Sequence, residues 1–278
     1  MTSNADTNTA GTLRYAMLQA INNTLDASST INFTITGQTI TLTNHLPVLS
    51  TLGNPTATIT VSGNNNTING GGQYQAFFVT PLVNNGTSLT GTLTANISDL
   101  NLNSCSVAGG NGGTGGGGGG LGAGGAIFVA PSATVNVSNV TFSSCSSVGG
   151  NGDQTINTSG GGGGGLRSGT GGTGASWNAF VGPYVVAGGG GGGFNSIGGQ
   201  GQNTQDEGSA GGGGGGANIR PGSAVASTNG GAGYISGMDA GGGGGAIGGN
   251  GGDGSASGGG SGAGGGGIGG SGGSGGSG

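Results

Sequence analysis

Apolar and polar residues alternate along short stretches of the first half of the chain. Ile31, Phe33 and Ile35 are separated by single polar residues, and the same period of two returns in residues 38–43, 57–62 and 92–97. Such alternation predicts strands with one buried face, and the Gly and Asn residues between these stretches are typical of strand ends. The pattern therefore predicts an all-β fold made of many short strands.

A different spacing precedes the strands. Apolar residues lie three and four positions apart in the segment after Thr12, at Leu13, Ala16, Met17, Ala20 and Ile21. This spacing places them on one face of a helix, and Thr is a good residue to cap its first turn. We expect an amphipathic helix that starts after Thr12 and covers part of the core.

An internal repeat narrows the choice among all-β folds. Residues 97–112 return as residues 137–152 at a constant offset of 40, which aligns Cys105 with Cys145. Removing the glycine-rich tract 109–125 leaves a repeat of about 23 residues. A short repeat of strands is typical of solenoids, in which each unit stacks on the one before it. The repeat favours a parallel β-helix over a sandwich or a barrel, with tract 109–125 as a loop that leaves the stack.

Several motifs resemble those of bacterial surface proteins. Gly11-Thr-Leu-Arg-Tyr-Ala-Met resembles the helix that opens many bacterial right-handed β-helix domains, and Gly124-Gly-Ala-Ile-Phe is similar to a motif of polymorphic outer-membrane proteins and autotransporter passengers. The partner motif of that family, Phe-x-x-Asn, is replaced here by Phe142-Ser-Ser-Cys. The resemblance covers residues 1–152. It implies a pectate-lyase-like right-handed parallel β-helix, capped by the N-terminal helix, on an extracellular or outer-membrane-associated protein.

Glycine divides the chain in two. Of 82 glycines, 22 lie in residues 1–148 and 60 in residues 149–278. We therefore expect a β-helix segment over residues 1–152 and a glycine-rich region over residues 153–278. That region carries glycine tracts at 160–165, 188–193, 211–216 and 241–245.

The tracts resemble the stacked glycine helices of some phage tail-tip adhesins, but glycine loses more freedom on folding than any other residue. Packed glycine helices and disorder both remain open for residues 153–278. The low-complexity end, Gly-Gly-Ser-Gly, indicates a piece of a longer chain.

Charge and composition exclude several classes of function. The chain has 3 Arg and no Lys against 8 acidic residues, a net charge of −5. Nucleic acid is held through basic side chains, so it is not an expected partner. One His and two Cys are poor material for a zinc site, and no apolar run approaches the ~20 residues of a membrane helix. Residues 248–253 match the start of a calcium-binding nonapeptide, but such a match arises by chance in glycine-rich sequence. We expect no metal, no cofactor and no membrane span.

The two cysteines are the first candidate for chemistry. If the repeat forms adjacent coils, Cys105 and Cys145 lie on neighbouring strands about 4.8 Å apart. That separation is within reach of a disulfide, although aligned side chains would strain it. Stacked reduced thiols and a disulfide both remain open.

Acidic and aromatic residues supply the remaining candidates. The only adjacent acids are Asp206 and Glu207, in a polar insert, so we expect solvated charges and no catalytic residues. Trp177, Phe180 and Tyr184 lie close together in the longest insert between glycine tracts. Such rings suit recognition of glycans or proteins, but they also pack on one another as a small local core.

Three functions fit this sequence. The first is a non-enzymatic structural and adhesive segment that contacts host cells or glycans through the β-helix and its glycine-rich loops. The second is an enzyme that acts on polysaccharide, which requires clustered acids. The third is an ice-binding solenoid with flat Thr-rich faces, although the runs at residues 39–43 and 58–61 do not build a regular Thr-x-Thr ladder.

Overall fold

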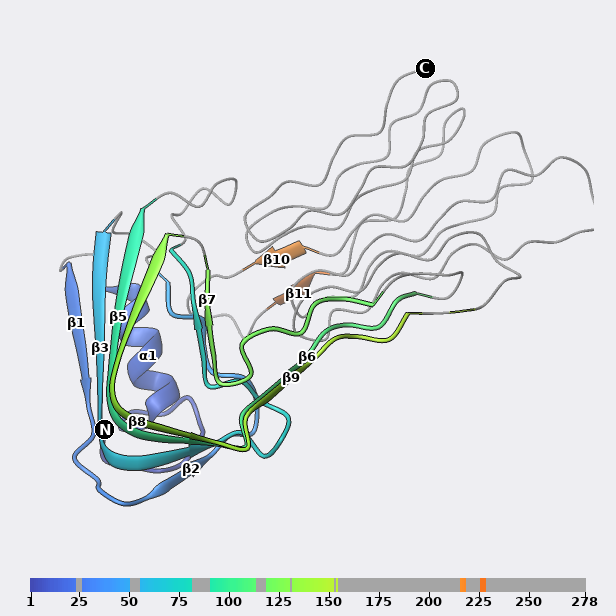
Figure 1. Ribbon diagram of the computed structural model, residues 1–278. Coiled ribbons are helices and arrows are strands. Elements are labelled where there is room, and N and C mark those ends of the chain that lie inside the picture. The colour runs from blue at the N-terminus through green and yellow to red at the C-terminus, as the bar shows by residue number, and fades with distance from the viewer. Residues whose placement is uncertain are drawn as a thin grey trace, which may run out of the picture.

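A computed structural model describes residues 1–23, 27–50, 56–81, 91–113, 119–130, 132–152 and 154, and the two short strands 216–218 and 226–228. The described residues form mostly parallel sheets, with a single helix among them (Figure 1). The predicted all-β class with one N-terminal helix is therefore confirmed for this part of the chain.

The helix α1 (Leu13–Asn22) begins where the sequence predicts. The side chain of Thr12 accepts a hydrogen bond from the backbone N–H of Tyr15, which satisfies one of the free donors of the first turn. Leu13, Met17 and Ile21 are the buried residues of the helix. Their spacing places them on one face, which packs into the core beside the first strand.

Four strands of the main sheet lie in the order β1-β3-β5-β8, and β2 also pairs with β3. Their bounds are β1 (Ser28–Asn32), β2 (Thr39–Thr41), β3 (Thr56–Asn69), β5 (Thr92–Asn103) and β8 (Ala133–Ser143). All of these pairs are parallel.

Three small sheets complete the described strands. Two are parallel pairs, β4 (Phe77–Val79) with β7 (Ile127–Val129) and β6 (Ser106–Ala108) with β9 (Ser146–Val148). The third is an antiparallel pair, β10 (Gly216–Asn218) with β11 (Ala226–Thr228).

The internal repeat is visible in the register. Ile97 lies beside Val137, Leu102 beside Phe142 and Ser106 beside Ser146, so the offset of 40 holds through both β5–β8 and β6–β9. Between β4 and β7 the offset is 50. The difference arises because 12 residues separate β4 from β5, whereas three separate β7 from β8.

Strands β3, β5 and β8 are longer than the sequence predicts because each continues through a bend. Three residues of β3, Gly63 to Asn65, stand opposite the single residue Asp99 of β5. The backbone φ angles of Asn64, Asn65, Asp99 and Asn139 are between 50° and 58°. Asn and Asp tolerate this left-handed conformation better than most residues, so the strand turns a corner without ending.

The core lies on the inner side of these strands. Ile31, Val61 and Ile97 are in register on consecutive strands, and all three are buried. One buried polar side chain, Asn66, sits at the corner. Its amide donates to the carbonyls of Ile35 and Gly63, each at 2.7 Å, and accepts from the N–H of Gln38 at 2.8 Å. Burial of Asn66 is tolerated because its amide is hydrogen-bonded on both sides.

Beyond β6 and β9, glycine segments run side by side (Figure 1). We call residues 109–112, 119–125 and 149–151 the glycine layer. Backbone N–H groups connect its segments: Gly109 donates to Val148, Gly120 to Gly110, and Gly150 to Gly120, at 2.7 to 2.9 Å. A Cβ atom built on Gly119 or Gly150 would lie 1.8 or 1.9 Å from a backbone oxygen. Only glycine therefore fits these positions.

Candidate functional site

The outer side of the main sheet carries a regular set of uncharged polar residues, which we call the polar face. In β3 and β5 these residues alternate with apolar residues that face the core, and between all four strands they are in register. The polar face consists of Ser28, Thr30 and Asn32 in β1, Thr58, Thr60 and Ser62 in β3, Thr94, Asn96 and Ser98 in β5, and Thr134, Asn136 and Ser138 in β8. Every member is Ser, Thr or Asn.

The residues of the polar face form three columns that run across the strands. One column contains Ser28, Thr58, Thr94 and Thr134, from β1, β3, β5 and β8 in turn. Neighbouring strands lie about 4.8 Å apart, and alternate residues along a strand are roughly 6.6 Å apart. The face is therefore a grid of hydroxyl and amide groups with two regular spacings.

A second set of polar residues lies past the corner. Thr39, Thr67, Asn101 and Thr141 form one column, and Thr41, Asn69, Asn103 and Ser143 form the next. We call these eight residues the second polar face. It has the same chemistry, because Thr, Asn and Ser are again its only residue types.

Hydrogen bonds between equivalent side chains hold the columns together. In the main face Asn136 donates to the amide oxygen of Asn96 at 2.9 Å, and Asn96 donates to the hydroxyl of Thr60 at 3.4 Å. In the second face Thr141 donates to Asn101, and Ser143 donates to Asn103 at 3.0 Å. These contacts orient the side chains that they join.

Asp99 is the one charged residue at the corner between the two faces. Asn139 donates to its carboxylate at 2.7 Å. This hydrogen bond, and a second one from Ser98, hold the pKa of Asp99 below its ordinary value of 3.8. The carboxylate is partly exposed and stays ionised at neutral pH.

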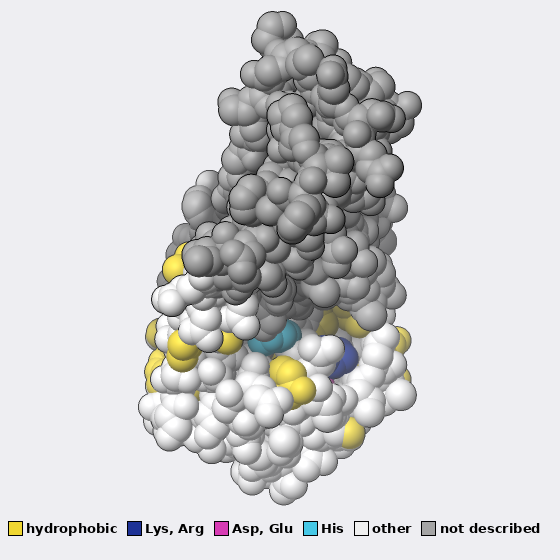
Figure 2. All heavy atoms as spheres, turned by 90° about the vertical axis from the view of Figure 1, so that its right-hand side faces the viewer, with side chains coloured by type: hydrophobic (Ala, Val, Ile, Leu, Met, Phe, Trp, Pro, Cys, Tyr) yellow, Lys and Arg dark blue, Asp and Glu magenta, His cyan; other side chains and the backbone are white. Residues whose placement is uncertain are grey.

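Neutral hydroxyl and amide groups can both donate and accept hydrogen bonds. The methyl groups of Thr add small apolar contacts between them. Such a surface suits a ligand that is itself uncharged and rich in hydroxyl groups. Figure 2 shows the molecule from the opposite side, where a basic side chain and a histidine lie among uncharged polar, backbone and scattered hydrophobic atoms.

The two cysteines are neighbours in the structure, and both are free thiols. Cys105 is buried, whereas Cys145 in the next repeat is half-buried. The thiol of Cys145 donates to the carbonyls of Leu102 and Ser143, each at 3.4 Å. Burial, with the neighbouring Cys145 as the second cause, raises the pKa of Cys105 to about 12. Cys105 is therefore a neutral, unreactive thiol at physiological pH.

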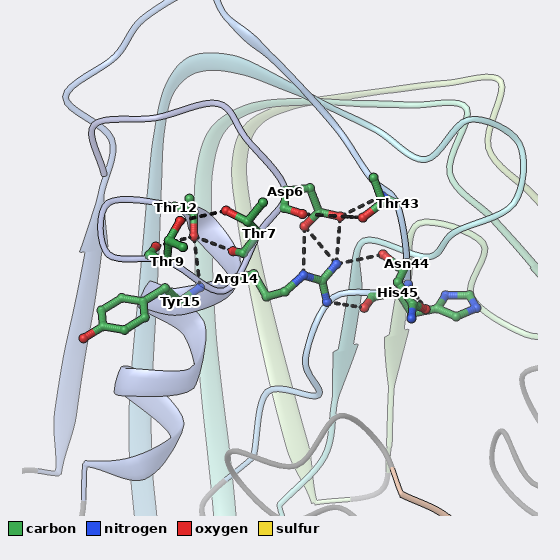
Figure 3. Close-up of polar contacts among 9 residues, drawn as sticks. All are labelled: Asp6, Thr7, Thr9, Thr12, Arg14, Tyr15, Thr43, Asn44 and His45. Atoms are coloured by element: carbon green, nitrogen blue, oxygen red, sulfur yellow. Dashed lines mark hydrogen bonds and ion pairs between the residues drawn. The ribbon is translucent and has the colours of Figure 1, made fainter.

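An ion pair that the sequence analysis did not single out joins three segments near the N-terminus (Figure 3). Asp6 and Arg14 lie 2.8 Å apart, and their side chains are 2% and 17% exposed. Arg14 also donates to the backbone carbonyls of Asn44 and His45, at 3.0 and 2.8 Å. The N–H of Thr43 donates to Asp6 at 2.7 Å. The charged groups of Asp6 and Arg14 bond to each other and to nearby backbone groups, so the role of the pair is structural.

The pKa of Asp6 reflects two opposed effects. Burial alone raises it, but hydrogen bonds from Arg14 and from the backbone of Thr43 outweigh burial. Their combined effect lowers the pKa of Asp6 from its ordinary value of 3.8. The carboxylate therefore remains ionised, and paired with Arg14, at neutral pH.

The aromatic candidates Trp177, Phe180 and Tyr184 lie outside the described residues, as do Asp206, Glu207 and the calcium-like segment 248–253. Among the residues that the structure describes, no three His, Cys, Asp or Glu side chains gather where they could hold a metal ion. Within the same residues, no helix is both long and apolar enough to cross a bilayer.

Comparison of the chain with protein-family models, with curated proteins and with solved structures finds no match.

Proposed function

We propose that residues 1–152 form a right-handed parallel β-helix that serves as a non-enzymatic, adhesive segment of a secreted or bacterial cell-surface protein. Two observations support the β-helix. The chain returns to the same sheets in parallel register at an offset of 40 in two of them, and α1 covers the first strand. The motifs at residues 11–17 and 124–128 resemble those of bacterial surface β-helix proteins. They support a secreted or cell-surface location.

The polar face is the contact surface in this proposal, and an uncharged glycan of a host-cell surface is its ligand. The observation that carries the proposal is the registered grid of Ser, Thr and Asn on β1, β3, β5 and β8. Each hydrogen bond to a sugar hydroxyl is weak, because it replaces a hydrogen bond to water. Adhesion therefore depends on many such contacts at once along a rigid surface.

Binding of the purified full chain to an array of neutral glycans tests this function. Replacing both Thr58 and Thr94 by Val removes two neighbouring hydroxyls of one column while keeping the side-chain shape. We expect glycan affinity to fall about tenfold, in line with roughly 1.4 kcal/mol net loss for the two hydroxyls together. The matched control is T39V/T41V, which changes two exposed threonines of the second polar face.

Salt provides a second readout of the same experiment. Binding through neutral groups should change little between low and high salt, because there is no ion pair to screen. Equal affinity of T58V/T94V and the wild type, or binding that high salt abolishes, would contradict the proposal.

Ice is a second candidate ligand, which one observation favours. Thr58, Thr94 and Thr134 are consecutive in one column, so a Thr ladder runs across the strands. A flat array of hydroxyl and methyl groups with fixed spacing suits an ordered water surface. If the full chain inhibits ice recrystallisation and T58V/T94V does not, the result would support ice as the ligand. Ice crystals that grow as fast with the full chain as in buffer alone would rule ice out.

A further inference from the structure

The two ends of the strand stack differ in what covers the core. At the first end, α1 packs Leu13, Met17 and Ile21 into the core beside β1. At the other end β8 is the last described strand of its sheet, and no described strand covers it. Among the described residues, the stack therefore has one end covered by a helix, the closed end, and one end that is not covered, the open end.

Apolar side chains of the core reach the surface at the open end. Val137 is in register with buried Ile97, but is itself 50% exposed. Phe142 is in register with buried Leu102 and is 51% exposed. All of the exposed large hydrophobic side chains among the described residues belong to this last repeat: Leu121, Val129, Val137, Phe142 and Val148. The inner side of β8 thus continues the core without a layer above it.

The open end also lacks the features that normally keep sheet edges apart. Natural edge strands carry charges or prolines that block pairing with another chain. Strand β8 contains neither, and residues 119–152 contain no charged residue at all. A surface that meets its own copy places like charges against each other, so a surface without charge is well suited to that contact.

We propose that this end is a dimer interface, occupied by the same end of a second copy of the chain. A two-fold axis through the interface places β8 antiparallel to β8 of the other copy. The free backbone groups of both edges then form hydrogen bonds, and Val137 and Phe142 of each copy are covered. The described segments of the glycine layer run to the side of the stack (Figure 1).

The closed end limits this assembly to two copies. A helix covers β1, so the interface cannot repeat head to tail, and a dimer is formed rather than a fibre. The inference concerns residues 119–148 only. It holds whether or not the polar face binds a glycan.

The mass of the full chain in solution, measured by light scattering over a range of concentrations, tests the interface. We expect about twice the chain mass of 25.3 kDa for the wild type at the higher concentrations. The variant V137K/F142K places four lysines in the interface of a dimer and should remain a monomer. The matched control T30K/T41K adds the same charge at exposed positions of β1 and β2, away from the open end, and should remain a dimer.

Hydrogen exchange of the β8 amides distinguishes a dimer interface from coverage of β8 by later residues of the same chain. The dimer predicts that these amides become protected as the concentration rises, while circular dichroism confirms that each variant is folded. A wild type that stays monomeric at every concentration overturns the proposal. So does a V137K/F142K variant that still dimerises. A monomer with concentration-independent protection of β8 would show that later residues of the same chain cover this end, which also overturns it.

Discussion

Single glycines have unequal roles in the glycine layer, although the sequence around them is uniform. A Cβ on Gly150 would lie 1.9 Å from the carbonyl oxygen of Gly110, whereas a Cβ on the adjacent Gly149 would lie 3.7 Å from its nearest neighbour. The first distance is impossible without movement of the backbone, and the second is an ordinary contact. The two residues are therefore a matched pair.

We predict that G150A destabilises the chain by about 1–3 kcal/mol, the range typical of overpacked sites. G149A should change the free energy of unfolding by less than about 0.5 kcal/mol, as exposed substitutions usually do. Urea denaturation of both variants measures the difference. Equal stabilities would mean that the backbone contacts of the glycine layer are absent in solution.

The terminal segment, α1 and the loop at residues 43–45 are separate elements that depend on one ion pair. Asp6 belongs to the first, Arg14 to the second, and Thr43 to the third, and every contact among them is a charge-assisted or backbone hydrogen bond. Such pairs are costly to break when they are buried, because the remaining charge has no partner. The closed end of the stack is thus held by polar contacts as well as by apolar ones.

Acid should weaken this connection. Because the folded-state pKa of Asp6 is lowered, its stabilising contribution is present above the ordinary pKa of 3.8 and is lost as the pH falls through the folded value. The variant D6N lacks this contribution and leaves Arg14 unpaired, so we expect a loss of about 3 kcal/mol at pH 7.

The free energy of unfolding, measured from pH 7 to pH 2, checks this prediction. The wild type should lose more stability over that range than D6N does. The control D99N changes a partly exposed carboxylate at the corner, where Asn139 shows that Asn is accepted in the next repeat. D99N should lose less stability at pH 7 than D6N does, because Asp99 has hydrogen bonds but no ion pair among the described residues. Parallel pH profiles for the wild type and D6N would mean that Asp6 does not govern the acid response.

The described residues up to 152 form a stack with one continuous core, covered at one end by α1. Met17 is fully buried there, whereas Gln19, two residues later, is exposed. The contribution of the cap to the stability of the stack can therefore be measured at two nearby positions of one helix.

We expect M17A to lower the free energy of unfolding by about 2–5 kcal/mol, the range for truncation of a buried large side chain. Q19A should stay within about 0.5 kcal/mol of the wild type. Thermal or urea unfolding followed by circular dichroism provides the comparison. A cap that contributes nothing would leave the two variants indistinguishable.

Side-chain patterns predicted most of this stack. The spacing after Thr12 located α1, and the repeat that aligns Cys105 with Cys145 predicted the register of β5 with β8. The bends were missed because Gly63 and its neighbouring Asn residues resemble a strand end, although the left-handed backbone there lets β3 continue. The polar columns were not predicted, because the members of each column come from different strands and are far apart in the sequence. The contacts within the glycine layer could not be predicted, because glycine has no side chain whose pattern would indicate them.

The glycine layer also determines how such a chain can change over generations. Every missense change of a glycine codon adds at least one heavy atom, and at Gly119, Gly122 and Gly150 that atom would collide with a backbone oxygen. Duplication or loss of whole glycine codons adds no side chain, and repetitive codons are prone to such events during replication. We expect selection to remove substitutions at these three positions, while the length of the segments varies freely. Related chains should differ in the number of glycines in the layer far more than in their identity.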